Sequence, residues 1–267
     1  LMPIGGEYWH IVDIPKGASA GRIGRILAEN KVIRSGLGFD LLARITHKSS
    51  SLKPGAYRLS PSMPPGEIMD KIVKGDISAK WVTIPEGFTV RRIAERLAAQ
   101  GLVNEDRFLY LASNGQSFDA GFAHGDNLEG YLFPDTYLIP LGSTEEAVIR
   151  QMLDCFNKRV VGFMASTKPD MSLDKVVILA SLIEREVRVP KDRPLVSAVL
   201  RNRLRIGMRL ECDATVLYAL GRHKSRVLYS DLDVDSPYNT YRYAGLPPGA
   251  IANPGLDCIK AALDPAK

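Results

Sequence analysis

Hydrophobic positions follow two different spacings along this chain. In the first half, short apolar runs that predict β-strands alternate with stretches whose apolar residues recur every three or four positions, as in amphipathic helices. Ile23, Ile26 and Leu27 show the helical spacing, and so do residues 90–97. Helical spacing dominates the second half and stops at about residue 221. The pattern predicts an α+β protein in which a small βααβ unit precedes a larger, mixed and helix-rich domain.

One stretch of the first half occurs twice, with an offset of 70 residues. Seven positions are identical in the two copies: Ile14/Ile84, Pro15/Pro85, Gly17/Gly87, Arg22/Arg92, Ile23/Ile93, Leu27/Leu97 and Ala28/Ala98. Each copy predicts a strand, a Pro-x-Gly turn and a helix, because proline fixes φ and glycine tolerates the positive φ of a tight turn. A second helix, a strand and a third helix follow, the first copy ending in a helix over 65–74. We therefore expect domains over 7–77 and 80–267, although two similar units without a common function would give the same pattern.

The second half opens with an apolar run from Val176 to Ile183 that contains nothing more polar than Ser181. A helix that is apolar on nearly every side is usually buried. A further helix is predicted over 191–208, with an apolar stripe that includes Leu195, Val199 and Leu200, and a third helix is closed by Gly221. Residues 235–255 hold four prolines, too many for a sheet interior, which predicts a long structured loop.

The apolar run ends on two carboxylates, Glu184 and Glu186. At helical spacing Glu184 shares a face with Ala180 and Ser181, whose small side chains predict a depression that a ligand could enter. An apolar surface disfavours the charged form of a carboxyl, and a general acid must keep its proton near neutral pH. Glu186 stands over bulkier neighbours, which suits packing. The spacing alone favours a plainer interpretation, in which both glutamates are helix-end charges paired with nearby arginines.

The chain has 267 residues, a net charge of +5 and a sequence pI of about 9.1. This mild basicity fits an anionic partner such as nucleic acid, cell-wall polymer or lipid headgroup, and it fits a basic surface without a partner equally well. Arg201, Arg205 and Arg209 recur every four residues, as on a helix face that contacts phosphates. A single stripe of this kind favours an ordinary charged face, so we expect no nucleic-acid partner.

The cysteines and the hydropathy suggest neither a cofactor nor a membrane span. Cys155, Cys212 and Cys258 match no zinc-binding spacing, and we predict no metal and no cofactor. No run of about 18 apolar residues, the length that crosses a bilayer, occurs in the sequence. The first residues do not resemble a natural N-terminus, so we expect this chain to be a piece of a longer one.

Several long motifs, in the same order and spacing, closely resemble the endolytic murein transglycosylases of the YceG-like family. They are "TIPEGFTVRRIAERL", "LEGYLFPDTY", "ASLIEREV", "RNRLRIGMRLECDATVLYALG" and "SPYNTYRYAGLPPGAIANPG". The resemblance runs from about Trp9 to the last residue. It implies a lytic transglycosylase that cleaves the MurNAc-β-1,4-GlcNAc bond within peptidoglycan glycan strands and leaves 1,6-anhydroMurNAc ends. It also implies that residues 7–77 are a LysM-like subdomain ahead of the catalytic domain.

The resemblance also assigns roles by position. The family's catalytic acid falls on Glu184, and its substrate-binding positions fall on Ser181, Glu186, Tyr238, Asn239, Thr240 and Tyr241. Cys212 and Ala214 depart from the family's usual Thr-Asp-Pro-Thr, while Asp213 and Thr215 remain. The chain stops before the family's final strand-rich segment, so we expect the catalytic domain to be truncated at its C-terminal end.

Location and partners are implied in the same way. Members of the family are held in the inner (cytoplasmic) membrane by one N-terminal helix, which this chain lacks, and their soluble part faces the periplasm and the cell wall. The resemblance implies peptidoglycan glycan strands as substrate. It also implies cell-wall synthesis enzymes as neighbours, because the family belongs to the elongation machinery.

One carboxylic acid suffices for the implied chemistry. Ordinary glycosidases need two carboxyl groups, whereas a lytic transglycosylase uses the C6 hydroxyl of its own substrate as nucleophile. One residue then protonates the leaving O4 and later accepts the C6 proton. The matched motifs show no obvious partner carboxylate, which predicts a transglycosylase rather than a hydrolase. The alternative is a glycan-binding module without catalysis, which the LysM-like unit would suit and which would produce no anhydro ends.

Overall fold

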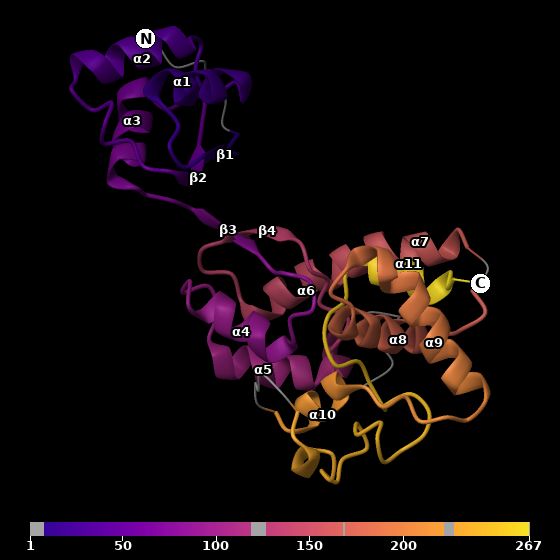
Figure 1. The fold of residues 1–267 in the computed structure, drawn as a ribbon. Helices are drawn as coiled ribbons and strands as arrows, with labels where there is room; N and C mark the ends of the chain where they lie inside the picture. The colour runs from indigo at the N-terminus through magenta and orange to yellow at the C-terminus, as the bar shows by residue number, and fades with distance from the viewer. Residues whose placement is uncertain (1–7, 119–126, 168, 222–226, 267) are drawn as a thin grey trace. The chain divides into compact units, whose positions relative to one another are not determined.

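A computed structural model of the chain describes residues 8–118, 127–167, 169–221 and 227–266 and shows an α+β structure (Figure 1). The chain forms two compact units. Unit 1 comprises Leu1–Val82 and Thr136–Gly142, and unit 2 comprises Thr83–Asp135 and Ser143–Lys267. The predicted α+β class is therefore confirmed. Among the described residues, no helix has the length and apolar character needed to cross a bilayer.

Unit 1 combines a four-stranded sheet with three helices. The strands lie in the order β1-β2-β3-β4, and β1 pairs antiparallel with β2 in a register that sets Val12 opposite Tyr57. The strands are β1 (His10–Ile14), β2 (Gly55–Leu59), β3 (Ala79–Thr83) and β4 (Thr136–Pro140). The helices are α1 (Ala20–Glu29), α2 (Gly36–Ile45) and α3 (Pro65–Lys74). The predicted βααβ order and the helix over 65–74 are both observed.

The core of unit 1 is formed by the inner faces of these strands and helices. Ile23, Phe39 and Tyr57 are among its largest fully buried side chains. Helices α1 and α2 approach backbone to backbone, because a Cβ added at Gly24 would lie only 2.3 Å from the carbonyl oxygen of Gly36. Glycine at this contact therefore allows the two helices to cover the core as a tight pair.

The sequence repeat corresponds to a structural repeat. The order strand, helix, helix, strand, helix occurs as β1-α1-α2-β2-α3 and again as β3-α4-α5-β4-α6. Gly17 and Gly87 occupy the two Pro-x-Gly turns with φ of +77° and +74°. Ser19 and Thr89 cap the helices that follow, each accepting a hydrogen bond of 3.3 Å from the backbone N–H three residues later. The prediction of a repeated unit is confirmed at the level of elements and caps.

Unit 2 is built around one buried helix, α8. Its α-helices are α4 (Val90–Ala98), α5 (Glu105–Ser113), α6 (Glu145–Phe156), α7 (Gly162–Ala165), α8 (Leu173–Glu186), α9 (Arg193–Arg205), α10 (Asp213–Ala219) and α11 (Leu256–Leu263). Shorter turns are η1 (Gly115–Phe118), η2 (Asn157–Val161), η3 (Pro190–Asp192) and η4 (Tyr229–Asp231). Helices α9, α10 and α11 contact α8, whose residues 176–183 are buried except Ile178. The helix predicted from the apolar run is therefore confirmed as part of the core.

The remaining predictions for unit 2 hold with one correction. On α9 only Leu200 of the three named stripe positions is buried, whereas Leu195 and Val199 are 57% and 54% exposed. The stripe is wider than the surface that α8 and α11 cover. Helix α10 is followed by Gly221 at φ +63°, as predicted. Among the described residues between α10 and α11 the only helical turn is η4, which confirms the long loop.

Candidate active site

Glu184 lies in the last turn of α8 and is partly buried. One carboxylate oxygen accepts a hydrogen bond of 2.9 Å from the backbone N–H of Gly255, the residue that caps α11. The Cγ of Glu184 faces Gly87, where an added Cβ would approach it to 3.4 Å. Glu184 is therefore positioned by three segments: the end of α8, the turn after β3 and the start of α11. A helix N-terminus also supplies N–H donors suited to a carboxylate that has given up its proton.

A second carboxylate, which no pattern in the sequence indicated, lies beside Glu184. The side chain of Glu86 is about half exposed, and one of its oxygens would lie 2.0 Å from a Cβ added to Gly255. Its other oxygen is 3.6 Å from the guanidinium of Arg193. Burial raises the pKa of Glu86, and the charge of Glu184 raises it further against the opposing effect of Arg193. The sequence did contain one signal for Glu86. The equivalent turn position in the first copy of the repeat is Lys16, so the two copies carry opposite charges there.

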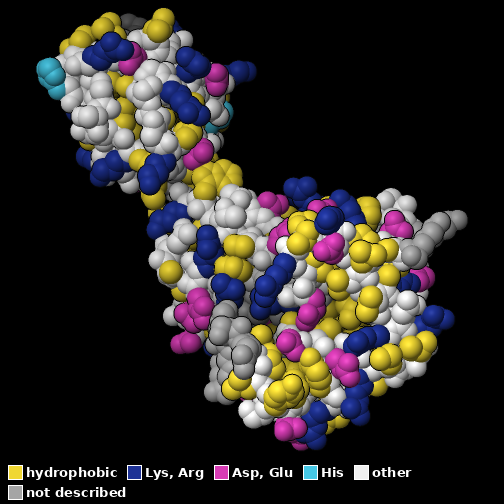
Figure 2. Space-filling model, in the orientation of Figure 1, with side chains coloured by type: hydrophobic (Ala, Val, Ile, Leu, Met, Phe, Trp, Pro, Cys, Tyr) yellow, Lys and Arg dark blue, Asp and Glu magenta, His cyan; other side chains and the backbone are white. Residues whose placement is uncertain are grey.

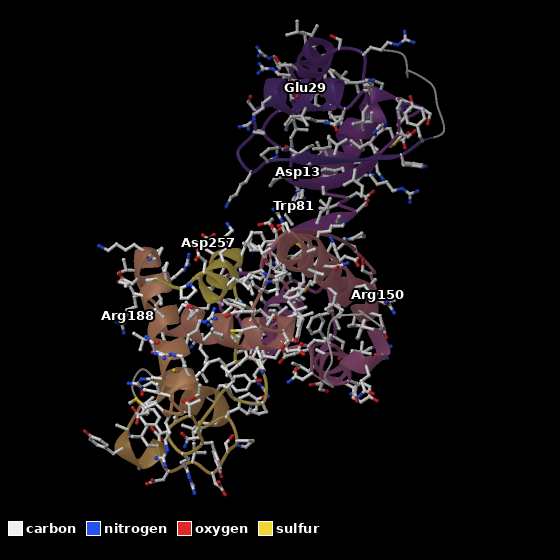
Figure 3. The ribbon with its side chains drawn as sticks, turned by 90° about the vertical axis from the view of Figure 1, so that its right-hand side faces the viewer. Asp13, Glu29, Trp81, Arg150, Arg188 and Asp257 are labelled. Atoms are coloured by element: carbon white, nitrogen blue, oxygen red, sulfur yellow. The ribbon has the colours of Figure 1, made fainter. Side chains whose placement is uncertain are left out.

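The first turn of α11 adds two more groups to this cluster. Asp257 (Figure 3) has a carboxylate oxygen 3.5 Å from Arg193, the cation that also pairs with Glu86. The thiol of Cys258 is buried, and burial together with the neighbouring charge of Glu184 raises the pKa of Cys258. Arg193 thus balances two carboxylates at the edge of the site.

The depression predicted beside Ala180 and Ser181 is filled by the chain itself, so that prediction is wrong. Both residues are fully buried. The hydroxyl of Ser181 donates to the carbonyl of Ile178 at 2.7 Å and accepts from the N–H of Ile251 at 3.1 Å. The small side chains admit the loop that folds back after α10. In this structure Ser181 therefore holds the segment that leads to Gly255, with its hydroxyl occupied by the backbone.

Asn253 and Glu129 join the segments around Glu184 in a buried network. The amide oxygen of Asn253 accepts from two backbone N–H groups in residues 130–132, at 3.0 and 2.9 Å. Its amide nitrogen donates to the carbonyl of Phe88 at 2.9 Å and to Glu129 at 3.0 Å. Both oxygens of Glu129 also accept from the N–H of Val90, at 3.0 and 3.2 Å. The network ties the start of α4, residues 127–132 and the loop before α11 to one another.

A cavity of about 790 Å³ opens next to this network, a size typical of ligand sites. Its walls come from α4, α5, α10 and neighbouring loops, and they include Glu95, Tyr110, Glu129, Arg185, Tyr218 and Ile251. Burial raises the pKa of Glu129 to about 8, although hydrogen bonds from Val90, Tyr218 and Asn253 act in the opposite direction. The lining contains Arg185 and not Glu184. Geometry by itself therefore offers two acids, Glu184 at the meeting of three segments and Glu129 in the cavity wall.

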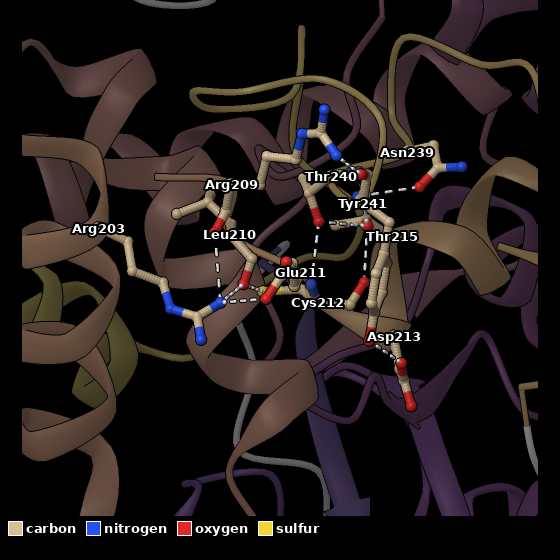
Figure 4. Close-up of polar contacts among 10 residues, drawn as sticks. All are labelled: Arg203, Arg209, Leu210, Glu211, Cys212, Asp213, Thr215, Asn239, Thr240 and Tyr241. Carbon is tan, nitrogen blue, oxygen red and sulfur yellow. Dashed lines mark hydrogen bonds and ion pairs between the residues drawn. The ribbon is translucent and has the colours of Figure 1, made fainter. Parts of the chain in front are cut away.

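The loop motif over residues 238–241 is held by a polar network at the start of α10 (Figure 4). Asn239 is fully buried and donates both amide hydrogens to backbone carbonyls earlier in the loop, at 2.8 and 2.9 Å. The hydroxyl of Thr240 lies 2.9 Å from that of Thr215 and accepts from the N–H of Cys212 at 3.0 Å. The polar groups of Asn239 and Thr240 are thus engaged within the chain, which makes them anchors of the loop in this structure.

The two tyrosines of the motif keep part of their surface accessible. The ring of Tyr238 lies 4.9 Å from that of Tyr218, a residue of the cavity wall, and burial raises the pKa of Tyr238. Tyr241 donates to Asp213 at 2.6 Å. Among the motif residues, Tyr238 and Tyr241 are therefore the ones placed to offer a ring face to a ligand.

Glu186 and the arginine stripe serve the chain's own structure. The carboxylate of Glu186 accepts from the N–H of Ala214 at 3.3 Å, in the first turn of α10. The arginines bind backbone carbonyls and polar side chains of the chain: Arg201 binds Asp170 and Ala262, Arg203 binds Leu210 and Glu211, Arg205 binds Asn202, and Arg209 binds Tyr241. These contacts fit the charged helix face that the sequence favoured over a phosphate-binding surface.

Comparison with known proteins gives consistent matches over most of the chain. The sequence matches the YceG-like family over residues 12–267. It is 35% identical over 275 residues to the endolytic murein transglycosylase of Bacillus subtilis (strain 168), which covers 96% of this chain and 76% of that protein. The endolytic murein transglycosylase of Streptococcus pneumoniae serotype 2 (strain D39) is 30% identical over 303 residues, covering 100% of this chain and 54% of the relative.

A solved structure agrees with these matches. The 2.6 Å crystal structure of a YceG-like protein from Listeria monocytogenes has a TM-score of 0.69 and 35% sequence identity, covering 98% of this chain and 92% of that one. The fold and the site together define a class: an α+β protein with a carboxyl group in the last turn of a buried helix. The chain belongs to the YceG-like family, as its motifs indicated. It spans about half the length of the streptococcal relative.

Proposed function

We propose that this chain is the catalytic part of an endolytic peptidoglycan lytic transglycosylase. It would cleave the MurNAc-β-1,4-GlcNAc bond within glycan strands and leave 1,6-anhydroMurNAc ends, which would terminate glycan elongation. The observation that carries the proposal is the position of Glu184, held between Gly87 and Gly255 where three motifs shared with the family meet. Relatives named endolytic murein transglycosylase, at 30–35% identity, support the same assignment.

Glu184 is the proposed catalytic acid. It gives its proton to the leaving O4 while the C1–O4 bond breaks, and the C6 hydroxyl of the same MurNAc bonds to C1 in place of water. The Glu184 carboxylate, which accepts the N–H of Gly255, then takes the proton of that hydroxyl. One residue serves first as acid and then as base, and the reaction consumes no water.

The cavity beside the network is the proposed site for the neighbouring sugars. Tyr238 and Tyr241 are proposed to contact them through ring faces and hydroxyls. Asn239, Thr240, Ser181 and Glu186 are proposed to support binding indirectly, by holding the loop and α10 in place. Their engaged polar groups support this division of roles.

The test compares two Glu→Gln variants on purified sacculi, with mass spectrometry of the released muropeptides. Glu184→Gln keeps the shape and removes the proton, so we expect cleavage to fall by at least roughly 10²-fold while the protein stays folded. Glu129→Gln is the matched variant, and its folded fraction is expected to keep releasing anhydro ends. A folded but inactive Glu129→Gln protein beside an active Glu184→Gln protein would move the acid to Glu129.

The products decide between reaction classes. Muropeptides whose mass is lower by one water than that of muropeptides with reducing ends identify a transglycosylase. Ordinary reducing ends would identify a hydrolase. A hydrolase needs two carboxyl groups, and Glu86 would be the candidate for the second one. Binding to sacculi without new ends would support the alternative of a non-catalytic glycan-binding module.

Unit 1 is proposed to be a LysM-like module that binds glycan and takes no part in the chemistry. Its βααβ order, β1-α1-α2-β2, supports this. We further propose that the whole protein is anchored in the inner membrane by a segment outside this chain, with these units facing the periplasm and cell-wall synthesis enzymes as neighbours. Fractionation of the whole protein, with protease accessibility from the periplasmic side, tests the location.

A further inference from the structure

Two carboxylates, Glu86 and Glu184, meet at one glycine. Gly255 donates its N–H to Glu184 at 2.9 Å, and the position of a Cβ on the same residue lies 2.0 Å from an oxygen of Glu86. With the covalent geometry of Gly255, these two contacts place the carboxylates within roughly 7 Å of each other. The proposed acid therefore has a second acid as its direct neighbour.

Charged and titratable groups reach this site from every element packed around it. They are Arg185 on α8, Glu86 in the turn after β3, Asp257 and Cys258 in the first turn of α11, and Arg193 at the start of α9. Arg193 is largely buried, and its guanidinium contacts Glu86 and Asp257. The cation therefore acts on Glu184 through its carboxylate neighbours.

We propose that Glu86 and Glu184 form a carboxyl pair that holds one proton, with Glu86 as a positioning residue and Arg193 as the cation that limits its effect. The proposal rests on the proposed function and deepens it. Two carboxylates at this separation disfavour two negative charges, so the pair retains a proton to higher pH than one carboxyl alone. Arg193 neutralises part of the charge of Glu86 and weakens the effect.

The pair suits both halves of the proposed reaction. Before cleavage, the proton that the pair retains passes to O4 through Glu184, the proposed acid. After that transfer both carboxylates are negative, and their repulsion favours the return of one proton to the pair. The proton comes from the C6 hydroxyl as its oxygen bonds to C1. No reactant beyond the glycan is required.

The pH dependence of cleavage by the full chain on purified sacculi tests the pair. Glu86→Gln removes the charge and keeps the shape, so the alkaline limb of the rate profile should move to lower pH by about half a unit or more. The rate on the acid side should stay within about threefold. Glu86→Asp, which keeps the charge, should restore most of the profile.

Arg193→Gln should move the alkaline limb in the opposite direction, to higher pH. Glu105→Gln, the same change at a distant acid of α5, serves as the matched control.

Gly255→Ala provides a second test, in which residue 86 remains a glutamate but its carboxylate is moved. The φ of Gly255 is −73°, which alanine adopts readily, so the new methyl group would displace the flexible carboxylate of Glu86 and spare the backbone. The N–H donor to Glu184 is retained. We expect a folded protein whose rate profile matches that of Glu86→Gln.

Each outcome either supports or overturns the carboxyl pair. Profiles of Glu86→Gln and Gly255→Ala that overlay the profile of the unsubstituted chain would overturn the pair. An equal loss at every pH, not restored by Glu86→Asp, would show a structural role and overturn it as well. If the unsubstituted chain releases no anhydro ends at any pH, the proposed function itself fails, so the two failures are distinguishable.

Discussion

At the scale of single residues, buried polar side chains do most to define the site. Asn253 uses all of its side-chain hydrogen-bonding groups on two other segments, residues 129–132 and Phe88. Glu129 accepts from a backbone N–H, an amide and a tyrosine. Neither residue was predicted to be functional, because a single Asn or Glu in a motif carries no spacing signal. Glu184, by contrast, was noticed at the end of an apolar helix, and the resemblance to the YceG-like family then implied its catalytic role.

Asn253→Ala is expected to destabilise unit 2 strongly. The substitution leaves two N–H groups, one carbonyl and one carboxylate oxygen without their partner, and each buried unsatisfied group costs about 1–3 kcal/mol. The free energy of unfolding should fall by roughly 3 kcal/mol or more in denaturant titrations. Asn114→Ala, at an exposed asparagine, is the matched control and should change it by less than about 1 kcal/mol. Equal, small effects of the two variants would contradict the network.

Glu129 should make the stability of unit 2 depend on pH. Its pKa is raised to about 8 in the folded protein, so the folded state binds more protons than the unfolded state between the ordinary carboxyl range and pH 8. The stabilisation is complete at pH values below the ordinary carboxyl range and is lost as pH rises through about 8. Between pH 5.5 and 8.5 the loss should be on the order of 3 kcal/mol.

Denaturant titrations at these two pH values measure the effect. Glu129→Gln should be less stable at pH 5.5 and show a much flatter dependence, because the titrating group is gone. The stability of the variant should still fall slightly as pH rises, because the pKa values of Glu86 and Glu186 are also raised. Parallel curves for the variant and the unsubstituted chain would exclude Glu129 as the source.

At the scale of elements, contacts between segments complete what each helix lacks. The N-cap of α10, Cys212, makes no side-chain capping bond, and Glu186 at the end of α8 supplies an acceptor to the first turn instead. The hydroxyl of Ser181 similarly fixes the loop at Ile251. The sequence predicted the helices from their periodicity, but capping from a distant segment has no local signature.

Glu186→Ala should therefore act as the loss of a helix cap. We expect the free energy of unfolding to fall by about 0.5–2 kcal/mol, with cleavage reduced in part because α10 carries a wall of the cavity. Thermal unfolding and the initial rate on sacculi measure the two effects. Glu211→Ala, an exposed acid paired with Arg203, is the control and should have the smaller effect on stability. A Glu186→Ala protein with full stability but no activity would instead assign Glu186 to the chemistry.

At the scale of the whole molecule, the net charge is confined to one unit. Unit 1 holds 12 Lys and Arg against 7 Asp and Glu, and unit 2 holds 23 of each kind, so the entire +5 belongs to unit 1. Figure 2 shows basic side chains spread over the visible face of unit 1. Association with an anionic polymer should therefore depend on unit 1 and should weaken as salt is added.

Paired charge reversals test this in the intact chain. Lys31→Glu with Arg34→Glu, two exposed positions of unit 1, should lower retention on purified sacculi several-fold at low salt, and the difference should vanish at high salt. Lys158→Glu with Lys175→Glu makes the same change in unit 2 and should leave retention within about twofold. Equal losses would show that total charge, not unit 1, determines binding. Deletion of residues 7–77 is a poorer test, because it would remove β2 from the sheet that includes β3 and β4.

The sequence by itself determined the order of the main elements, the repeat and the buried helix that carries Glu184 in its last turn. These features follow from local rules: apolar periodicity, Pro-x-Gly turns and caps act within a few residues of one another. Tertiary structure alone decided that Glu86 lies beside Glu184, that the space over Ser181 is filled, and that Asn239 and Thr240 are anchors. The contacts of Thr240 and Ser181 join residues 25 and 70 positions apart, and Glu86 meets Glu184 at Gly255, whereas Asn239 binds carbonyls five and seven residues earlier in its loop. No short-range pattern in the chain encodes such a meeting, because burial and hydrogen bonding between distant segments are settled only when the core packs.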